Sequence, residues 1–185
     1  MRSGSNCEIR SPIRIFLNKL FYPEYRKVYW RKNRPLTWED FTDNPDDSRP
    51  HDAGIHWSIS FSLNVNFKHW RINVQPLFEC YIDRYISWVR STQESDHLLS
   101  HEQLHFDIAE LFTRKMRKKC LTIKSSVFRR WFTCEKVYYL YLNECKEMQV
   151  KYDMETNHSC NKKEQVKWEK YVKKELKEYE KFESQ

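Results

Sequence analysis

Residues Ile55 to Lys68, IHWSISFSLNVNFK, alternate between apolar and polar side chains without a break. Because successive side chains of a strand point to opposite faces, this pattern predicts a long strand with one buried face and one polar face. A second alternating segment follows at once, with Trp70, Ile72 and Val74 as its apolar positions. We therefore expect the two segments to pair as a hairpin that turns at Lys68-His69.

Shorter signals surround this hairpin. Pro76 interrupts the alternation, which resumes at Phe78, Cys80 and Ile82. An earlier short strand is expected near Val28 to Arg31. The segment from Asp43 to Asp52 holds two prolines and four aspartates, a composition that is typical of a surface loop.

After His97 the apolar residues follow a helical period. The spacing predicts one helix with Asp96 as N-cap, a second from Val127 to Val150 and a third from Glu164 to Phe182. In the second helix the apolar stripe recurs every three or four residues and consists of Val127, Trp131, Cys134, Tyr138, Tyr141, Cys145 and Met148. Such stripes usually face a core.

Strands followed by helices indicate an α+β fold, with an N-terminal antiparallel β-sheet and a C-terminal helical half. The length of 185 residues fits a single domain. We divide it into an N-terminal extension (1–26), a β-rich part (27–96) and a helical part (97–185).

Composition narrows the function classes. The net charge is +7, but lysines and arginines are interleaved with acids, notably from Lys162 to Lys181, which is typical of solvated helix faces. We therefore expect no nucleic-acid partner. No apolar run reaches the roughly 20 residues that cross a bilayer, so no integral membrane segment is expected. The start, Met1 to Phe21, makes a poor secretory signal because Arg14, Asn18 and Lys19 interrupt its apolar residues.

The six cysteines form no CxxC pair, which argues against a zinc ribbon. Cys134 and Cys145 lie on the apolar stripe of the second helix, so we expect them to be buried thiols. The even number of cysteines also permits disulfides, and the compartment stays open on this basis.

The first helix contains the sequence HExxH, from His101 to His105. Two histidines four residues apart project from one helical face and can hold a single ion, and the intervening Glu102 is placed to take a proton from an activated water. This pattern predicts one catalytic zinc ion, bound by His101 and His105, with Glu102 as general base.

A catalytic zinc site normally has three protein ligands. We favour His158 as the third, because it lies where the second helix is expected to end and to return the chain toward the first. Glu144 or Glu147 on the second helix would instead give a site of two histidines and one glutamate. Among the remaining groups, Asp107, Asp153 and Glu155 could orient the ligand histidines. Tyr152 could donate a hydrogen bond to a developing oxyanion.

Four segments resemble a bacterial family of predicted secreted zinc-dependent proteases, which is otherwise a domain of unknown function. They are Leu36–Phe41 (LTWEDF), Ser87–Val89 (SWV), Leu98–Ala109 (LLSHEQLHFDIA) and Tyr152–His158 (YDMETNH). The resemblance implies a zincin-like arrangement, zinc at His101, His105 and His158, Glu102 as base, and an envelope or extracellular location. Relatives tend to carry glycine where this chain has Ser159.

These observations predict a zinc-dependent metalloprotease that acts on a peptide or protein substrate. The alternative is a domain that binds zinc without catalysis and serves as an interaction module of the bacterial envelope. An extended peptide could dock on the strand from Ile55 to Phe67 if that strand lies at the edge of the sheet.

Overall fold

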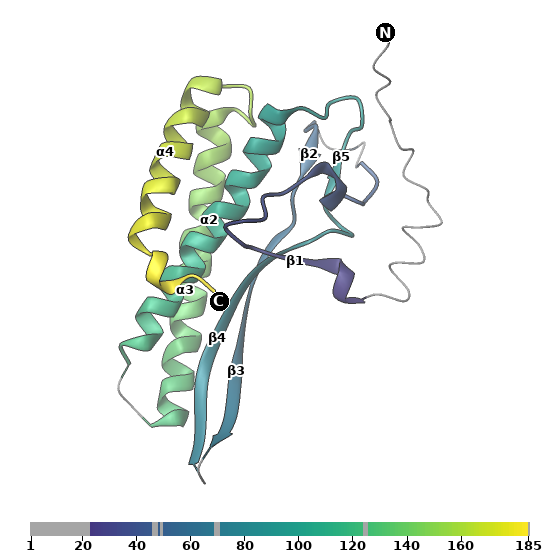
Figure 1. The fold of residues 1–185 in the computed structure, drawn as a ribbon. Helices are drawn as coiled ribbons and strands as arrows, with labels where there is room; N and C mark the ends of the chain where they lie inside the picture. The colour runs from purple at the N-terminus through teal and green to yellow at the C-terminus, as the bar shows by residue number, and fades with distance from the viewer. Residues whose placement is uncertain (1–22, 46–47, 49, 69–70, 124–125, 185) are drawn as a thin grey trace.

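The computed structural model describes residues 23–45, 48, 50–68, 71–123 and 126–184, and within these it omits the side chains of 65–68, 71–74, 127 and 128. Figure 1 shows a sheet on one side and three long helices packed together on the other. The predicted α+β class is confirmed. Residues 1–22 of the expected N-terminal extension, and the expected turn at His69, lie outside the described residues.

The main sheet is antiparallel and has the strand order β1-β4-β3, where β1 is Lys27–Tyr29, β3 is Trp57–Lys68 and β4 is Arg71–Asp83. The expected hairpin is confirmed, with a register that runs from Trp57 opposite Ile82 to Lys68 opposite Arg71. Within the described residues, β3 pairs only with β4, so β3 lies at an edge of the sheet.

Pro76 was expected to interrupt the alternation, but the strand β4 is continuous through it. It lies within β4, opposite Leu63 of β3. Proline is tolerated in a strand where its missing N–H would face an unpaired edge. Only the far end of β4 is paired on both sides, because β1 contacts Tyr81 to Asp83.

The buried face of β3 covers only part of the strand. Ile59 is buried, and Phe61 stacks on Trp131 and Tyr138 of the helical half. Leu63, the next apolar residue on that face, is exposed. The alternation thus predicted the strand but overestimated the length over which it packs against helices.

Two short strands, β2 (Ala53–Gly54) and β5 (Trp88–Val89), form a second antiparallel pair. A Cβ atom at position 54 would lie 3.0 Å from the Trp88 indole nitrogen, so glycine allows the two strands to approach closely. This pair forms one wall of the cleft described below.

Three helices complete the fold: α2 (Asp96–Leu121), α3 (Val127–Thr156) and α4 (Lys162–Glu178), the last followed by the short helix η3 (Glu180–Phe182). The N-cap of α2 is Ser95, one residue before the expected Asp96, because the serine side chain accepts a hydrogen bond from the Leu98 N–H. The smaller elements are η1 (Pro23–Arg26) and η2 (Trp38–Asp40). Among the described residues, no helix combines the length and apolar character needed to cross a bilayer.

The helix α3 is longer than the apolar spacing predicted. It continues past Val150 to Thr156, because Tyr152 and Thr156 extend its buried face and pack into the interior. Cys134 and Cys145 are buried free thiols on this face, as expected.

Buried charges join α2 to its neighbours. The Glu110 carboxylate accepts hydrogen bonds from Arg114 (2.9 Å) and Arg117 (3.0 Å). The Arg114 guanidinium also donates to the Leu176 carbonyl of α4, and that of Arg117 donates to the Phe78 carbonyl of β4. The Glu110 carboxylate therefore holds Arg114 and Arg117 in place, and these two arginines connect α2 to α4 and to β4.

Replacing Glu110 by Gln should lower the free energy of unfolding by about 3–5 kcal/mol, because two arginines would lose their shared buried carboxylate. Urea unfolding followed by circular dichroism measures this change. The control is Glu164→Gln, whose carboxylate pairs with the exposed Lys167 and should contribute less than about 1 kcal/mol. Equal losses in the two variants would contradict the assigned role of Glu110.

Candidate metal centre

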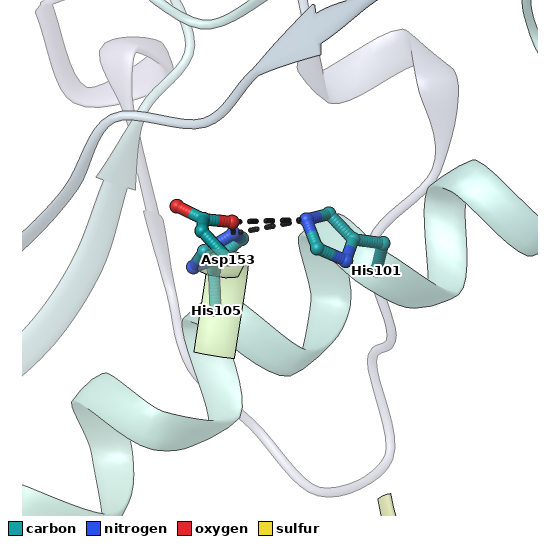
Figure 2. Close-up of side chains that lie close together, drawn as sticks. All are labelled: His101, His105 and Asp153. Atoms are coloured by element: carbon teal, nitrogen blue, oxygen red, sulfur yellow. Dashed lines mark hydrogen bonds and ion pairs between the residues drawn. The ribbon is translucent and has the colours of Figure 1, made fainter. Parts of the chain in front are cut away.

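The two histidines of HExxH lie on the face of α2 that packs against α3. Their Nε2 atoms are 3.2 Å apart. Both point at Asp153 of α3, whose Oδ1 atom lies 3.2 Å from His101 Nε2 and 3.0 Å from His105 Nε2 (Figure 2). Three potential ligand atoms thus form a nearly equilateral triangle.

The size of this triangle fits a metal ion. For ligands at about 2.0–2.1 Å, neighbouring donor atoms are about 3.3–3.4 Å apart in a tetrahedral site and about 2.9 Å apart at octahedral right angles. The observed separations of 3.0–3.2 Å fall between these two values. Two imidazoles and one carboxylate are also a donor set that transition metals accept in catalytic sites.

Two glutamines fix the orientation of the imidazole rings. The Nδ1 atom of His101 lies 3.1 Å from Gln165 Oε1, and that of His105 lies 2.5 Å from Gln149 Oε1. An amide oxygen can only accept, so each ring carries a proton on Nδ1, and Nε2, directed at the triangle, is the nitrogen that a metal would bind in place of a proton. This is the tautomer that a metal requires.

Each glutamine is itself oriented by further hydrogen bonds. The amide nitrogen of Gln149 donates to the His105 carbonyl at 2.9 Å. That of Gln165 donates to Glu169 Oε1 at 3.1 Å. The amide oxygens are therefore held toward the imidazoles.

Tyr152 lies behind the histidines. Its ring stacks on that of His101, and its hydroxyl donates to Gln165 Oε1 at 2.7 Å. Because Tyr152 is fully buried and its hydroxyl is engaged with Gln165, this geometry favours a supporting role over the oxyanion-donor role that the sequence indicated.

Glu102 lies at the edge of a cleft beside the histidines and is 4% exposed. Burial raises the pKa of its carboxyl group, while His105, His101 and a hydrogen bond from the Ile55 N–H oppose the rise. A raised carboxyl pKa is characteristic of general acid–base residues, since it brings the proton affinity closer to neutral pH. Its position is consistent with the predicted base.

Asp153 is in the ionised state that a metal ligand needs. Burial acts to raise its pKa, but hydrogen bonds from His101 and His105 outweigh burial and hold that pKa well below its usual range. Asp153 is therefore a carboxylate over the whole physiological pH range, as metal binding requires.

His158, the predicted third ligand, lies on the rim of the same cleft. Its Nδ1 atom is 3.6 Å from Asp153 Oδ1, and its ring packs on that of His51 with the centroids 4.1 Å apart. Burial lowers its pKa. The structure thus brings His158 to the site but places Asp153 closer to both HExxH histidines.

The turn that carries His158 has an unusual backbone. Asn157, His158 and Ser159 have φ values of 47°, 49° and 72°, all in the left-handed region. Such a run is strained for residues with side chains and tends to occur at functional sites. His97 Nε2 lies 2.6 Å from the Ser159 carbonyl oxygen and holds the turn against the start of α2. The conformation at Ser159 explains why glycine would be favoured there.

The other candidates are not brought to the site. Glu144 and Glu147 are exposed on α3 and do not line the cleft. Asp107 accepts hydrogen bonds from Trp30 and Gln103, and Glu155 accepts one from Trp168. These carboxylates bond to other residues, and the orienting role expected of Asp107 and Glu155 falls to Gln149 and Gln165.

The cleft has a volume of about 440 Å³. Its walls come from α2, the end of α3 and the β2–β5 pair, and its lining includes Gly54, Trp57, Trp88, His101, Glu102, His105, Asp153 and His158. A larger cavity of about 760 Å³ lies between α2 and α4, but its lining contains none of the three ligand candidates. The chemistry therefore favours the smaller cleft as the functional site.

Nothing in the sequence pointed directly to Gln149 and Gln165, and Asp153 was expected to orient the histidines while His158 was favoured as the third ligand. One signal was present: Gln149 and Asp153 are four residues apart and border Cys145 and Tyr152 on the buried side of α3. Polar residues at such positions need partners inside the protein.

Comparisons of the chain with protein-family models, with curated proteins and with solved structures found no match. The family resemblance therefore rests on the sequence motifs alone.

Replacing Gln149 by Ala should weaken zinc binding about 10–100-fold, because His105 would lose the acceptor that fixes its tautomer. Competition with a chromogenic chelator measures the affinity. Gln103→Ala is the control, since Gln103 lies on α2 close to His105 in sequence but bonds to Leu36 and Asp107. Unchanged affinity in Gln149→Ala would contradict the orienting role.

Proposed function

We propose that this protein is a zinc-dependent hydrolase that cleaves peptide bonds. The proposal rests mainly on one observation: the ligand atoms of His101, His105 and Asp153 lie 3.0–3.2 Å from one another, beside the buried carboxyl group of Glu102. Three ligands, a candidate base and a cleft are what metal-assisted hydrolysis requires.

Zinc is the metal we favour. Two imidazoles and one carboxylate also form the ligand set of non-haem iron(II) oxygenases, so the donor atoms alone do not select the metal. The presence of Glu102 supports zinc, because a general base beside the metal ligands is the arrangement of hydrolytic HExxH zinc sites. When bound, zinc supplies Lewis acidity that polarises a carbonyl and lowers the pKa of water.

Residues of the chain itself transfer the proton, orient the imidazoles and contact the substrate. Glu102 accepts the proton of the attacking water and returns it to the leaving amine. The amides of Gln149 and Gln165 keep the two imidazoles in the tautomer that binds metal. His158 lies on the cleft rim, where an imidazole N–H can donate to the carbonyl oxygen of a substrate.

A peptide substrate is supported by the sheet. Within the described residues β3 pairs only with β4, and its first residue, Trp57, lines the cleft. An extended peptide can add to such an edge through main-chain hydrogen bonds. Tyr138 donates to the Ile59 carbonyl further along β3, which limits strand addition to the end nearest the cleft.

The resemblance to predicted secreted zinc-dependent proteases supports the same class of reaction. It also implies a zincin-like fold and an envelope or extracellular location, which we include in the proposal. The resemblance assigned the third ligand position to His158, whereas the distances favour Asp153.

Glu102→Gln should lower peptide hydrolysis at least about 100-fold and leave the zinc content unchanged, because the amide cannot accept the proton from water. Quenched fluorescent peptide mixtures and elemental analysis provide the two measurements. Glu155→Gln is the control, since that carboxylate bonds to Trp168 outside the cleft. Activity retained in Glu102→Gln would disprove the base assignment.

Asp153→Ala should lose most of its zinc, whereas His158→Ala should keep about one ion per chain. Elemental analysis after dialysis against a weak chelator distinguishes the two variants. The reverse result would return the third ligand position to His158. Native protein that binds zinc but cleaves no peptide would favour the alternative, a metal-binding interaction module.

A further inference from the structure

The helix α3 packs one face into the protein and carries a second row of apolar residues on its exposed side. Phe132, Tyr139, Leu140, Val150 and Met154 are between 46% and 75% exposed. At about 100° per residue, all five fall within a sector of about 100° and extend over about 33 Å of the helix. We call these five residues the exposed α3 stripe. Isolated apolar residues on a surface are common, but five on one face of a single helix indicate an interaction surface.

Three polar residues interrupt the stripe within the same sector: Lys136, Asn143 and Glu147, all exposed. Their order has an internal symmetry. Asn143 is central, with Phe132 eleven residues before it and Met154 eleven residues after it. An eleven-residue repeat keeps one face of an α-helix aligned along its length, so this face can pack against a second long helix.

We propose that the exposed α3 stripe is a homodimer interface, in which α3 pairs antiparallel with α3 of a second copy and Asn143 lies on the two-fold axis. Charge selects this arrangement. A parallel pair would place Lys136 against Lys136 and Glu147 against Glu147, which is repulsive. The antiparallel pair places Lys136 within about one helical turn of Glu147 of the partner subunit.

The same register brings together the apolar ends of the stripe and the two central amides. Phe132 faces Met154 of the partner subunit at both ends, where an aromatic ring meets a flexible thioether. At the centre the two Asn143 amides face each other and can exchange hydrogen bonds, which fixes the register of a helix pair. A lipid surface is a poorer occupant, because Glu147 would be desolvated there without a cation.

Sedimentation equilibrium up to about 100 µM chain tests the proposal, since this range detects dimers of micromolar Kd. The native protein should be a dimer, and Leu140→Glu and Tyr139→Glu should each raise Kd at least about tenfold, because both place a carboxylate near Glu147 of the partner subunit. Val166→Glu is the matched control, because Val166 is 46% exposed on α4 outside the stripe. A monomeric native protein, or a dimer that Val166→Glu weakens as much as the stripe variants, would overturn the proposal.

Charge reversal tests the antiparallel arrangement. Lys136→Glu and Glu147→Lys should each weaken the dimer, because each places like charges together. The double variant should restore the native Kd to within about threefold, as expected for a direct pair. Double-variant losses equal to the sum of the single losses would overturn the antiparallel register.

A cysteine at the axis gives an independent test. In a background with Cys7→Ser and Cys160→Ser, Asn143→Cys should form a disulfide-linked dimer with oxidised glutathione, because the two thiols would face each other. Lys170→Cys, exposed on α4, is the control and should remain a monomer on a denaturing gel. Equal cross-linking of the two variants would contradict the two-fold axis at Asn143. None of these measurements depends on metal binding or hydrolysis.

Discussion

The antiparallel packing of α2 against α3 brings together the three ligand candidates of the metal centre. His101 meets Asp153, His105 meets Gln149, and the buried thiols of Cys120 and Cys134 share a hydrogen bond near the connection between the helices. Each step toward the C-terminus of α2 matches an equal step toward the N-terminus of α3. One register therefore supplies a ligand and an orienting amide together, and a shift of one residue would rotate both away by about 100°.

The sequence predicted most elements because their apolar periods are regular. The alternation from Ile55 predicted β3, and the three-and-four spacing predicted α3 up to Val150. It predicted an interruption at Pro76, where β4 is continuous, since the tolerance of a proline depends on which edges of the strand are paired. Edge pairing is a tertiary property that no local pattern contains.

The candidate centre was predictable only in part for a related reason. HExxH placed His101, Glu102 and His105 on one helix, where local geometry is sufficient. The choice between Asp153 and His158 depends on where α3 ends. Since α3 continues to Thr156, Asp153 faces α2 from within the helix while His158 lies beyond the C-cap, in a strained turn. Gln165 comes from a third helix, so only packing brings it to His101.

The neutral glutamines have a consequence for the electrostatics of the cleft. Carboxylate partners would accept stronger hydrogen bonds from the Nδ1–H groups and make the imidazoles more electron-rich. More electron-rich imidazoles lower the Lewis acidity of a bound ion. Amide partners hold the rings in place without adding charge. Asp153 is then the sole anion among the three ligand candidates, so a divalent cation held there would keep a net positive charge. An ion bound there would be held less tightly than by two carboxylates, but it would polarise a carbonyl group in the cleft more strongly.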